Sequence, residues 1–134
     1  MQATDPAASD TLILSLGGRA WGLGVRGVRE LLRAVEILPT AGRPGVEGVI
    51  DVRGEVIPVL DLRGRLGLPP KEVTPADCLI LVERAGGPIA LRVDGVGELV
   101  AGPGASAGYA RTADGRPAAM LDLDALFGDE PGGA

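Results

Sequence analysis

The residues best suited to recognising another molecule stand at a predicted tight turn, Arg53-Gly54. Two short runs rich in β-branched residues, 49–52 and 55–60, flank this dipeptide, and the pattern predicts a β-hairpin whose turn needs a glycine at positive φ. Arg53 would then present a planar, permanently charged donor at the exposed tip of a rigid element. Such a group suits a carboxylate on another protein, although an arginine at a turn can also serve only to solvate it.

Four aspartates are candidates for acid–base chemistry. They stand at the ends of apolar strands, where burial can raise the pKa of a carboxyl group: Asp51, Asp61, Asp94 and Asp122. Each also lies in the context of a turn or a helix N-cap, which accounts for it without catalysis. No activated nucleophile, phosphate-binding loop or metal cluster accompanies them in the sequence. We expect no enzymatic activity, and the acid–base alternative requires two of these carboxylates to share a dry cleft.

The composition removes most catalytic and metal-binding chemistry. The 134 residues include no histidine, which excludes histidine-based triads and metal sites. Cys78 is the single cysteine, so it can form neither an internal disulfide nor a multi-cysteine zinc cluster. Its apolar surroundings in the sequence predict a buried, unreactive thiol. We therefore expect neither a metal nor a cofactor.

The charge and hydropathy patterns limit the classes of partner. A net charge of −5 opposes binding to nucleic acid or to anionic lipid, and one Trp, one Tyr and one Phe are too few to stack bases. No run is long and apolar enough for membrane insertion, and the N-terminus lacks the features of a signal peptide. We expect a cytoplasmic protein with one domain at residues 11–128 and disordered tails at residues 1–10 and 129–134.

A heptapeptide pattern occurs twice in the chain. V-x-G-V-x-E-L describes residues 25–31 and residues 93–99. Each copy follows a Leu-Ile-Leu run and a Gly-Gly turn, and each precedes a Leu-Asp-Leu element. Three matched elements in the same order favour two related halves, at about residues 11–67 and 78–128. The alternative is that β-proteins reuse similar hairpins.

Each half is predicted to consist mainly of short strands. Residues 12–16, 20–25 and 34–38 have the composition of strands, and residues 27–32 fit one helical turn with three apolar side chains on one face. Asp61 and Asp122 are predicted N-caps of short helices that stop at Gly67 and Gly128. Pro58 has no N–H to donate, so its strand should lie at a sheet edge or be bulged. An edge strand beside Arg53 would suit docking of another chain.

The segment that contains the predicted hairpin resembles a known family. Residues 48–62 read G-V-I-D-V-R-G-E-V-I-P-V-L-D-L, which is similar to the hallmark hairpin of the CheW family of chemotaxis coupling proteins. Residues 28–31, 38–40 and 89–96 are similar to flanking pieces of the family pattern, in the same order. The resemblance implies an all-β fold of two small five-stranded SH3-like β-barrels packed together, with short helical turns. In that family the first strand can contribute to the second barrel.

The resemblance also implies the function of a non-enzymatic adaptor. Proteins of this family couple the cytoplasmic tips of transmembrane chemoreceptors to the regulatory domain of a CheA-type histidine kinase, in membrane-associated receptor arrays. Position by position, the resemblance implies eight partner-binding residues: Val28, Glu30, Gly48, Ile50, Asp51, Arg53, Gly54 and Asp94. Core packing for Val28, a solvated charge for Glu30 and a turn for Asp94 remain alternatives.

Two features depart from the family pattern. Asp51 stands where asparagine is usual, and we expect it to pair with Arg53 and to weaken what Arg53 offers a partner. Residues 101–108 are short and rich in glycine and alanine where the family has a longer connection, which predicts a trimmed second barrel. A diverged CheW-like module that binds a different protein, in surface motility or gene regulation, is therefore the alternative function.

Overall fold

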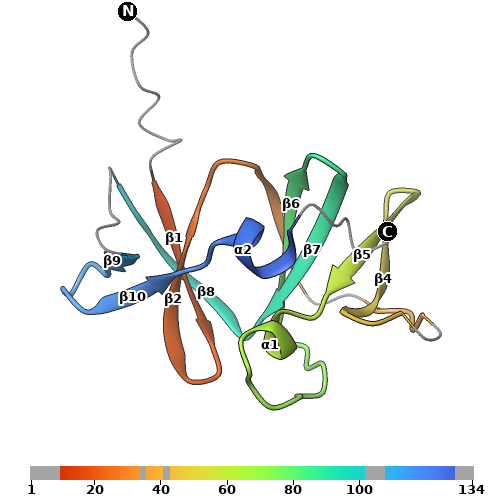
Figure 1. The fold of residues 1–134 in the computed structure, drawn as a ribbon, viewed down its shortest axis with the longest axis horizontal. Coiled ribbons are helices and arrows are strands. Elements are labelled where there is room, and N and C mark those ends of the chain that lie inside the picture. Colours follow the sequence, from red (N-terminus) through yellow and green to blue (C-terminus); the bar gives the residue numbers. More distant parts are fainter. Residues whose placement is uncertain (1–9, 34–35, 41–42, 102–107, 129–134) are drawn as a thin grey trace, which may run out of the picture. The chain divides into compact units, whose positions relative to one another are not determined.

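The computed structural model describes residues 10–33, 36–40, 43–101 and 108–128. These residues form ten strands and two short helices (Figure 1). In chain order the elements are β1 (Thr11–Leu16), β2 (Arg19–Gly24), β3 (Val28–Arg33), β4 (Val46–Val52), β5 (Glu55–Leu60), α1 (Leu62–Arg65), β6 (Cys78–Arg84), β7 (Gly87–Val93), β8 (Gly95–Val100), β9 (Tyr109–Arg111), β10 (Pro117–Met120) and α2 (Leu123–Phe127). The predicted tails lie outside the described residues, apart from Asp10.

The chain divides into two compact units, each with one five-stranded sheet. Unit 1 takes Met1–Arg26 and Asp94–Asp122, and its sheet has the order β8-β1-β2-β10-β9. Unit 2 takes Gly27–Val93 and Leu123–Ala134, and its sheet has the order β3-β6-β7-β5-β4. This confirms the predicted all-β class with two five-stranded elements and short helical turns.

The two sheets have the same strand order once β1–β5 are matched with β6–β10. In each sheet the central hairpin comes from one half of the sequence and the other three strands come from the other half. The pairing of β10 with β2 is parallel, as is the equivalent pairing of β5 with β7, and the other pairings are antiparallel. The compact units therefore differ from the halves at residues 11–67 and 78–128, because the halves exchange strands.

The core of unit 2 is built from side chains on one face of each of its strands. Ile50 pairs with Ile57 across β4 and β5, and both side chains are fully buried. The buried cluster consists of Ile50, Val52, Ile57, Val59, Leu79, Leu81 and Ala90, with Leu32 and Ile37 packed against it. Residues two apart in a strand share a face, so each contributing strand sends every second side chain into this core.

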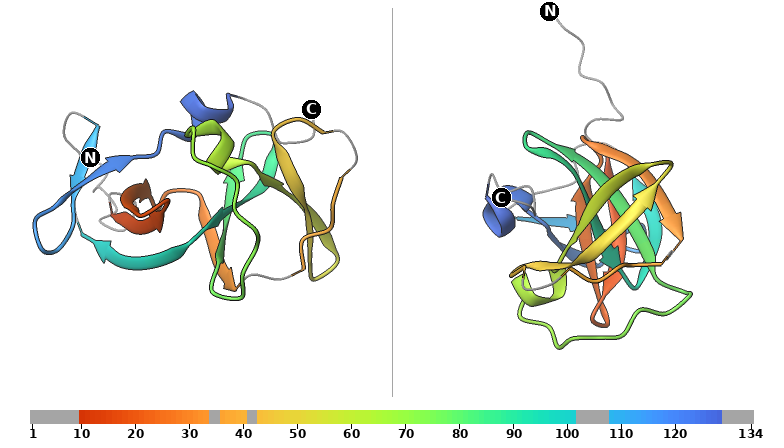
Figure 2. Two further views of the ribbon diagram at one scale, coloured as in Figure 1. Left: turned by 90° about the horizontal axis from the view of Figure 1, so that it is seen from below. Right: turned by 90° about the vertical axis from the view of Figure 1, so that its right-hand side faces the viewer.

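Unit 1 uses smaller side chains between its shorter strands. Ala110 and Ala118 are buried, on β9 and β10. A Cβ on Gly22 would lie 2.7 Å from the Sδ of Met120, so glycine allows β2 and β10 to approach closely. Figure 2 shows β9 and β10 (light blue to blue) as a short hairpin and β4 and β5 (yellow to olive) as a longer, twisted one.

The predicted helical turn at residues 27–32 is wrong, because this segment is strand β3. Its burial alternates with a period of two: Val28, Glu30 and Leu32 are partly buried, and the residues between them are exposed. Pairing with β6 satisfies the backbone groups of the segment and overrides its helical spacing. Of the strand predicted at residues 34–38, positions 34 and 35 lie outside the described residues. Leu38 forms an isolated antiparallel bridge to Val49.

The sequence predicts that the strand of Pro58 is an edge strand or is bulged there, and the edge alternative holds only locally. Strand β5 lies between β7 and β4 in the sheet, so it is not an edge strand as a whole. Its parallel pairing with β7 involves only Val59 and Leu60, whereas Pro58 pairs with Val49 of β4 on the other side. The missing N–H of Pro58 therefore falls on the part of β5 that β7 does not pair with.

The short helices begin and end close to the predicted residues. Asp61 is the N-cap of α1, and its Oδ1 accepts a hydrogen bond from the N–H of Gly64 at 3.0 Å. Gly67 follows α1 with φ of 74°, and Gly128 follows α2 with φ of 61°. Glycine adopts this left-handed conformation without the strain of a Cβ, which is why both helices stop there.

Candidate partner-binding surface

The turn between β4 and β5 holds Arg53 at an exposed position. Arg53 has φ of 52° and Gly54 has φ of 88°, as in a type I′ hairpin turn. The Oδ1 of Asp51 accepts a hydrogen bond from the N–H of Gly54 at 2.8 Å. The expected pairing of Asp51 with Arg53 is therefore corrected: the described contact of Asp51 closes the turn, because its carboxylate reaches the backbone three residues ahead.

The side chain of Arg53 pairs with Glu30 instead. Its Nη2 lies 2.6 Å from the Oε1 of Glu30, while 64% of the Arg53 side chain remains exposed. Strands β3 and β4 are the two edges of the unit 2 sheet, so this ion pair requires the sheet to curl until its edges meet. The hydrogen bond from Arg53 lowers the pKa of Glu30 below its ordinary value.

A second ion-pair group, centred on Arg29, lies beside the first. Arg29 Nη2 lies 3.1 Å from Glu55 Oε1, and Arg29 Nη1 lies 3.1 Å from Glu83 Oε2. The three residues come from β3, β5 and β6. We call the five charged residues of these two groups, Arg29, Glu30, Arg53, Glu55 and Glu83, the charged rim of unit 2.

Two of the residues assigned by resemblance, Ile50 and Gly48, have structural roles inside unit 2. Ile50 is fully buried in the core, which corrects the expectation that its side chain binds a partner. Alternation along β4 directs Ile50 inward and Asp51 outward. A Cβ on Gly48 would lie 2.3 Å from the carbonyl oxygen of Leu38, so glycine is required where the segment before β4 crosses that strand.

The remaining assigned residues divide between the two units. Val28 is partly buried and pairs with Val82 next to the charged rim. Asp94 belongs to unit 1, where its Oδ2 accepts a hydrogen bond from the N–H of Gly17 at 2.9 Å. The structure thus brings Val28, Glu30, Asp51, Arg53 and Gly54 to one end of unit 2 and places Asp94 in a turn of unit 1.

Sequence reasoning missed Arg29, Glu55 and Glu83. Arg29 and Glu83 are 54 positions apart, and their contact depends on which strands become neighbours. One feature of the sequence could have indicated Glu55 and Glu83. Each stands close to the end of a predicted strand, two residues away from an apolar residue that faces inward. A charged residue at such a position must reach the rim of the sheet, because it cannot remain unpaired in the core.

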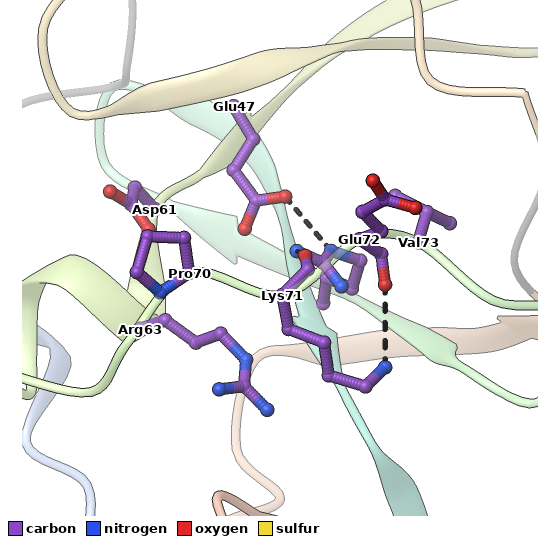
Figure 3. Close-up of a pocket in the computed structure, with 8 residues that line it drawn as sticks. Glu47, Asp61, Arg63, Pro70, Lys71, Glu72 and Val73 are labelled. Carbon is purple, nitrogen blue, oxygen red and sulfur yellow. Dashed lines mark hydrogen bonds and ion pairs between the residues drawn. The ribbon is translucent and has the colours of Figure 1, made fainter.

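A pocket of about 310 Å³ lies elsewhere in unit 2 (Figure 3). Its lining residues are Glu47, Asp61, Arg63, Pro70, Lys71, Glu72, Val73 and Arg92. Burial raises the pKa of Glu47, although its Oε1 accepts a hydrogen bond from Arg92 Nε at 2.8 Å. Of the four aspartates considered for acid–base chemistry, only Asp61 lines this pocket, and it caps α1. The pocket therefore lacks the pair of those carboxylates that the enzymatic alternative requires.

Arg92 ties the segment before β6 to the sheet. Its Nη1 donates to Asp77 Oδ2 at 2.9 Å and its Nη2 donates to the carbonyl of Lys71 at 2.8 Å. Burial opposes the charged form of Asp77, but hydrogen bonds from Lys71, Thr74 and Arg92 outweigh it, so the pKa of Asp77 is strongly lowered. These contacts make Arg92 a structural centre of unit 2 rather than a reactive group.

Within the described ranges, no group of three or more His, Cys, Asp or Glu side chains is placed to hold a metal ion. No helix in the same ranges is long and apolar enough to cross a membrane. Cys78 is only half-buried, at the start of β6, so the prediction of a buried thiol holds in part.

The fold and the surface together define a class of protein. One of the two five-stranded sheets carries an exposed hairpin turn with paired charges, and the described pocket is lined by ion-paired residues that hold the fold. This combination is typical of a protein-binding module.

Comparison with known proteins identifies the family. The family described as "CheW-like domain" matches residues 10–130, so this chain belongs to it. The chain is similar to the chemotaxis protein CheW of Bacillus subtilis, with 34% identity over 61% of this chain and 53% of that protein. It is also similar to the chemotaxis protein CheW of Rhizobium meliloti, with 24% identity over 90% of this chain and 88% of that protein.

A solved structure extends the similarity to the fold. The scaffolding protein TtCheW from Thermoanaerobacter tengcongensis superimposes with a TM-score of 0.76 and 28% identity, over 92% of this chain and 93% of that one. The match to the Bacillus subtilis protein spans about half of that relative, whereas the structural match is nearly complete on both sides. The relatives that this chain matches are named as chemotaxis proteins, and the solved structure that it matches is named as a scaffolding protein.

Proposed function

We propose that this chain couples the cytoplasmic tips of transmembrane chemoreceptors to the regulatory domain of a CheA-type histidine kinase. It would do so in the cytoplasm, at membrane-associated receptor arrays. The observation that carries the proposal is the turn at Arg53, which is rigid, exposed and charged. Family membership supplies the class of partner, and the turn supplies the surface.

Arg53 has the physical properties of an interface anchor. The type I′ turn and the Asp51 hydrogen bond define its backbone, and the Glu30 ion pair limits its side chain. Binding of a partner to Arg53 therefore costs little conformational entropy, because the residue is already ordered, and this favours affinity. Arginine is also among the residues most often found to dominate binding energy at interfaces.

A diverged role in another chemosensory pathway remains the second candidate. Strands β9 and β10 of unit 1 have only three and four residues, whereas the equivalent β4 and β5 have seven and six. A surface built on the shorter hairpin would differ from the one on the longer hairpin. Such a protein would keep one partner of the family and bind a different second one.

Affinity capture from the native organism, followed by mass spectrometry, tests both candidates. The wild-type chain should recover a chemoreceptor and a CheA-type kinase, and Arg53→Asp should lose at least one of them. Arg116→Asp is the matched control, because this arginine is also exposed, with 76% of its side chain accessible, on the hairpin loop of unit 1.

The Arg53 variant should remain folded. Loss of an exposed turn arginine should change the free energy of unfolding by about 0.5 kcal/mol. Recovery of one family partner together with an unrelated protein would favour the diverged role. Recovery of neither partner by the wild-type chain would contradict the coupling role, and binding indifferent to Arg53 would contradict the surface.

A further inference from the structure

Arg29 connects three strands at one end of unit 2. Its guanidinium contacts Glu55 at the start of β5 and Glu83 near the end of β6, each at 3.1 Å. Two carboxylates that share one guanidinium are held at fixed positions, because the planar fork of arginine directs its donors. The side chains of Glu55 and Glu83 nevertheless remain 44% and 53% exposed.

The strand register places both carboxylates above the core. Glu55 pairs with the buried Val52, and it shares its face of β5 with Ile57. Glu83 shares its face of β6 with Leu81, which belongs to the same core. The two side chains therefore stand where the inward face of the sheet ends and solvent begins.

The charges of the rim do not balance. It contains two arginines and three glutamates, a net charge of −1, and Asp51 on the adjacent turn adds another negative charge. Glu30 and Arg53 form a close pair of opposite charge, so the excess negative charge lies with Glu55 and Glu83. Val56 follows Glu55 in the chain and offers an apolar side chain that is 65% exposed on the outer face.

We propose that Arg29 is a positioning residue that holds Glu55 and Glu83 as a pair of acceptors for a basic side chain of the partner, next to an apolar side chain that contacts Val56. This rests on the proposed function, because it names the chemistry that the same surface recognises. A partner carboxylate directed at Arg29 would have to displace Glu55 or Glu83 and would meet the excess negative charge. A partner cation needs only the remaining acceptor capacity of the two carboxylates, since each can accept several hydrogen bonds.

Binding kinetics of purified proteins test this chemistry. The wild-type chain and its variants are measured by surface plasmon resonance against the regulatory domain of the CheA-type kinase and against a receptor cytoplasmic fragment, at a series of salt concentrations. Glu55→Gln with Glu83→Gln keeps the shape of the rim and changes its net charge from −1 to +1. Affinity for one of the two proteins should fall about tenfold at low salt, with a flatter dependence on salt.

The matched control removes the same charge elsewhere. Glu72→Gln with Asp114→Asn changes two exposed carboxylates that are not part of the rim, and its affinity should stay within about twofold of wild type. Arg29→Gln separates positioning from charge. It should increase the dissociation rate, because the two carboxylates are no longer held, without slowing association, because the rim becomes more acidic.

The outcomes are distinguishable. Wild-type binding that Glu55→Gln with Glu83→Gln leaves unchanged, or makes tighter, would overturn this inference and leave the proposed function standing. Tighter binding would indicate that the partner supplies a carboxylate. Loss of binding in the control as well would show a general charge effect and would also overturn it. Absence of wild-type binding to both proteins would overturn the proposed function, and this inference with it.

Discussion

Units 1 and 2 have the same strand order but differ in how they are held together. In unit 2, buried charges connect separate parts of the chain: Arg92 and Asp77 are almost fully buried and pair with each other. In unit 1, the described buried polar residues are Thr11 and Thr112. Two units with the same strand order can therefore be held together either by buried ion pairs or by the packing of small side chains. The identity of individual residues decides which of the two applies.

The equivalent glutamates of the repeated heptapeptide show the same contrast. Glu30 on β3 pairs with the side chain of Arg53 in the hairpin turn of unit 2. Glu98 on β8 accepts a hydrogen bond from the backbone N–H of Ala113, in the hairpin loop of unit 1. Each glutamate therefore joins one edge strand of its sheet to the hairpin at the opposite edge. Only in unit 2 does this contact position an arginine.

Both helices belong to unit 2. Helix α2 follows β10 of unit 1 in the chain, yet it is docked in unit 2 by two arginines. Arg65 donates to the carbonyl of Leu126 at 2.8 Å and lies over the ring of Phe127, and Arg84 donates to the carbonyl of Gly128. Cations near the last carbonyls of a helix stabilise it, so the docking of α2 depends on this pair of arginines.

Substitution of the buried Arg92 should produce the largest difference in stability between the two units. Arg92→Ala leaves Asp77 and Glu47 without their shared partner, and we expect a loss of about 3–5 kcal/mol in the free energy of unfolding. Urea denaturation measures it. Arg116→Ala in unit 1 is the control and should cost less than about 1 kcal/mol, since its ion pair is exposed. Equal losses would show that Arg92 is not the structural centre of unit 2.

Two glycines allow a matched test of close packing. Gly48→Ala places a Cβ 2.3 Å from a backbone oxygen that cannot easily move, and we expect a destabilisation of about 2 kcal/mol. Gly22→Ala in unit 1 meets the flexible end of Met120 first, so about 1 kcal/mol is expected. Thermal and urea unfolding provide both values. A larger cost at Gly22 would reverse the proposed difference in packing.

Acid should weaken unit 2 through Asp77. Its folded pKa is lowered, so the unfolded chain binds more protons, and the stabilisation present above about pH 4 is lost as the pH falls below it. Between about pH 6 and pH 3, the free energy of unfolding of Asp77→Asn should fall by about 1 kcal/mol less than that of the wild type. The raised pKa of Glu47 acts in the opposite direction, so the comparison with the variant isolates Asp77. Parallel pH profiles would contradict the contribution of Asp77.

Much of the local structure could be predicted from the residues. The hairpin turn at Arg53-Gly54, the Asp61 cap and the glycine stops depend on a few neighbouring positions, and the structure has them. The sequence does not distinguish strand β3 from a helical turn, because six residues contain too few apolar positions to separate the two periods. For the surface, the turn arginine was predictable, whereas burial of Ile50 and the close approach at Gly48 depend on which segments cross.

The amino-acid sequence by itself determined the all-β class, the repeated elements, the absence of histidine chemistry and the family. These properties reside in composition and in motifs a few residues long. Only the tertiary structure decided that the halves exchange strands, that Glu30 pairs with Arg53, and that Arg29 holds Glu55 and Glu83 together. The physical reason is that each of these contacts joins residues brought together by sheet closure, and no local pattern encodes which edges meet.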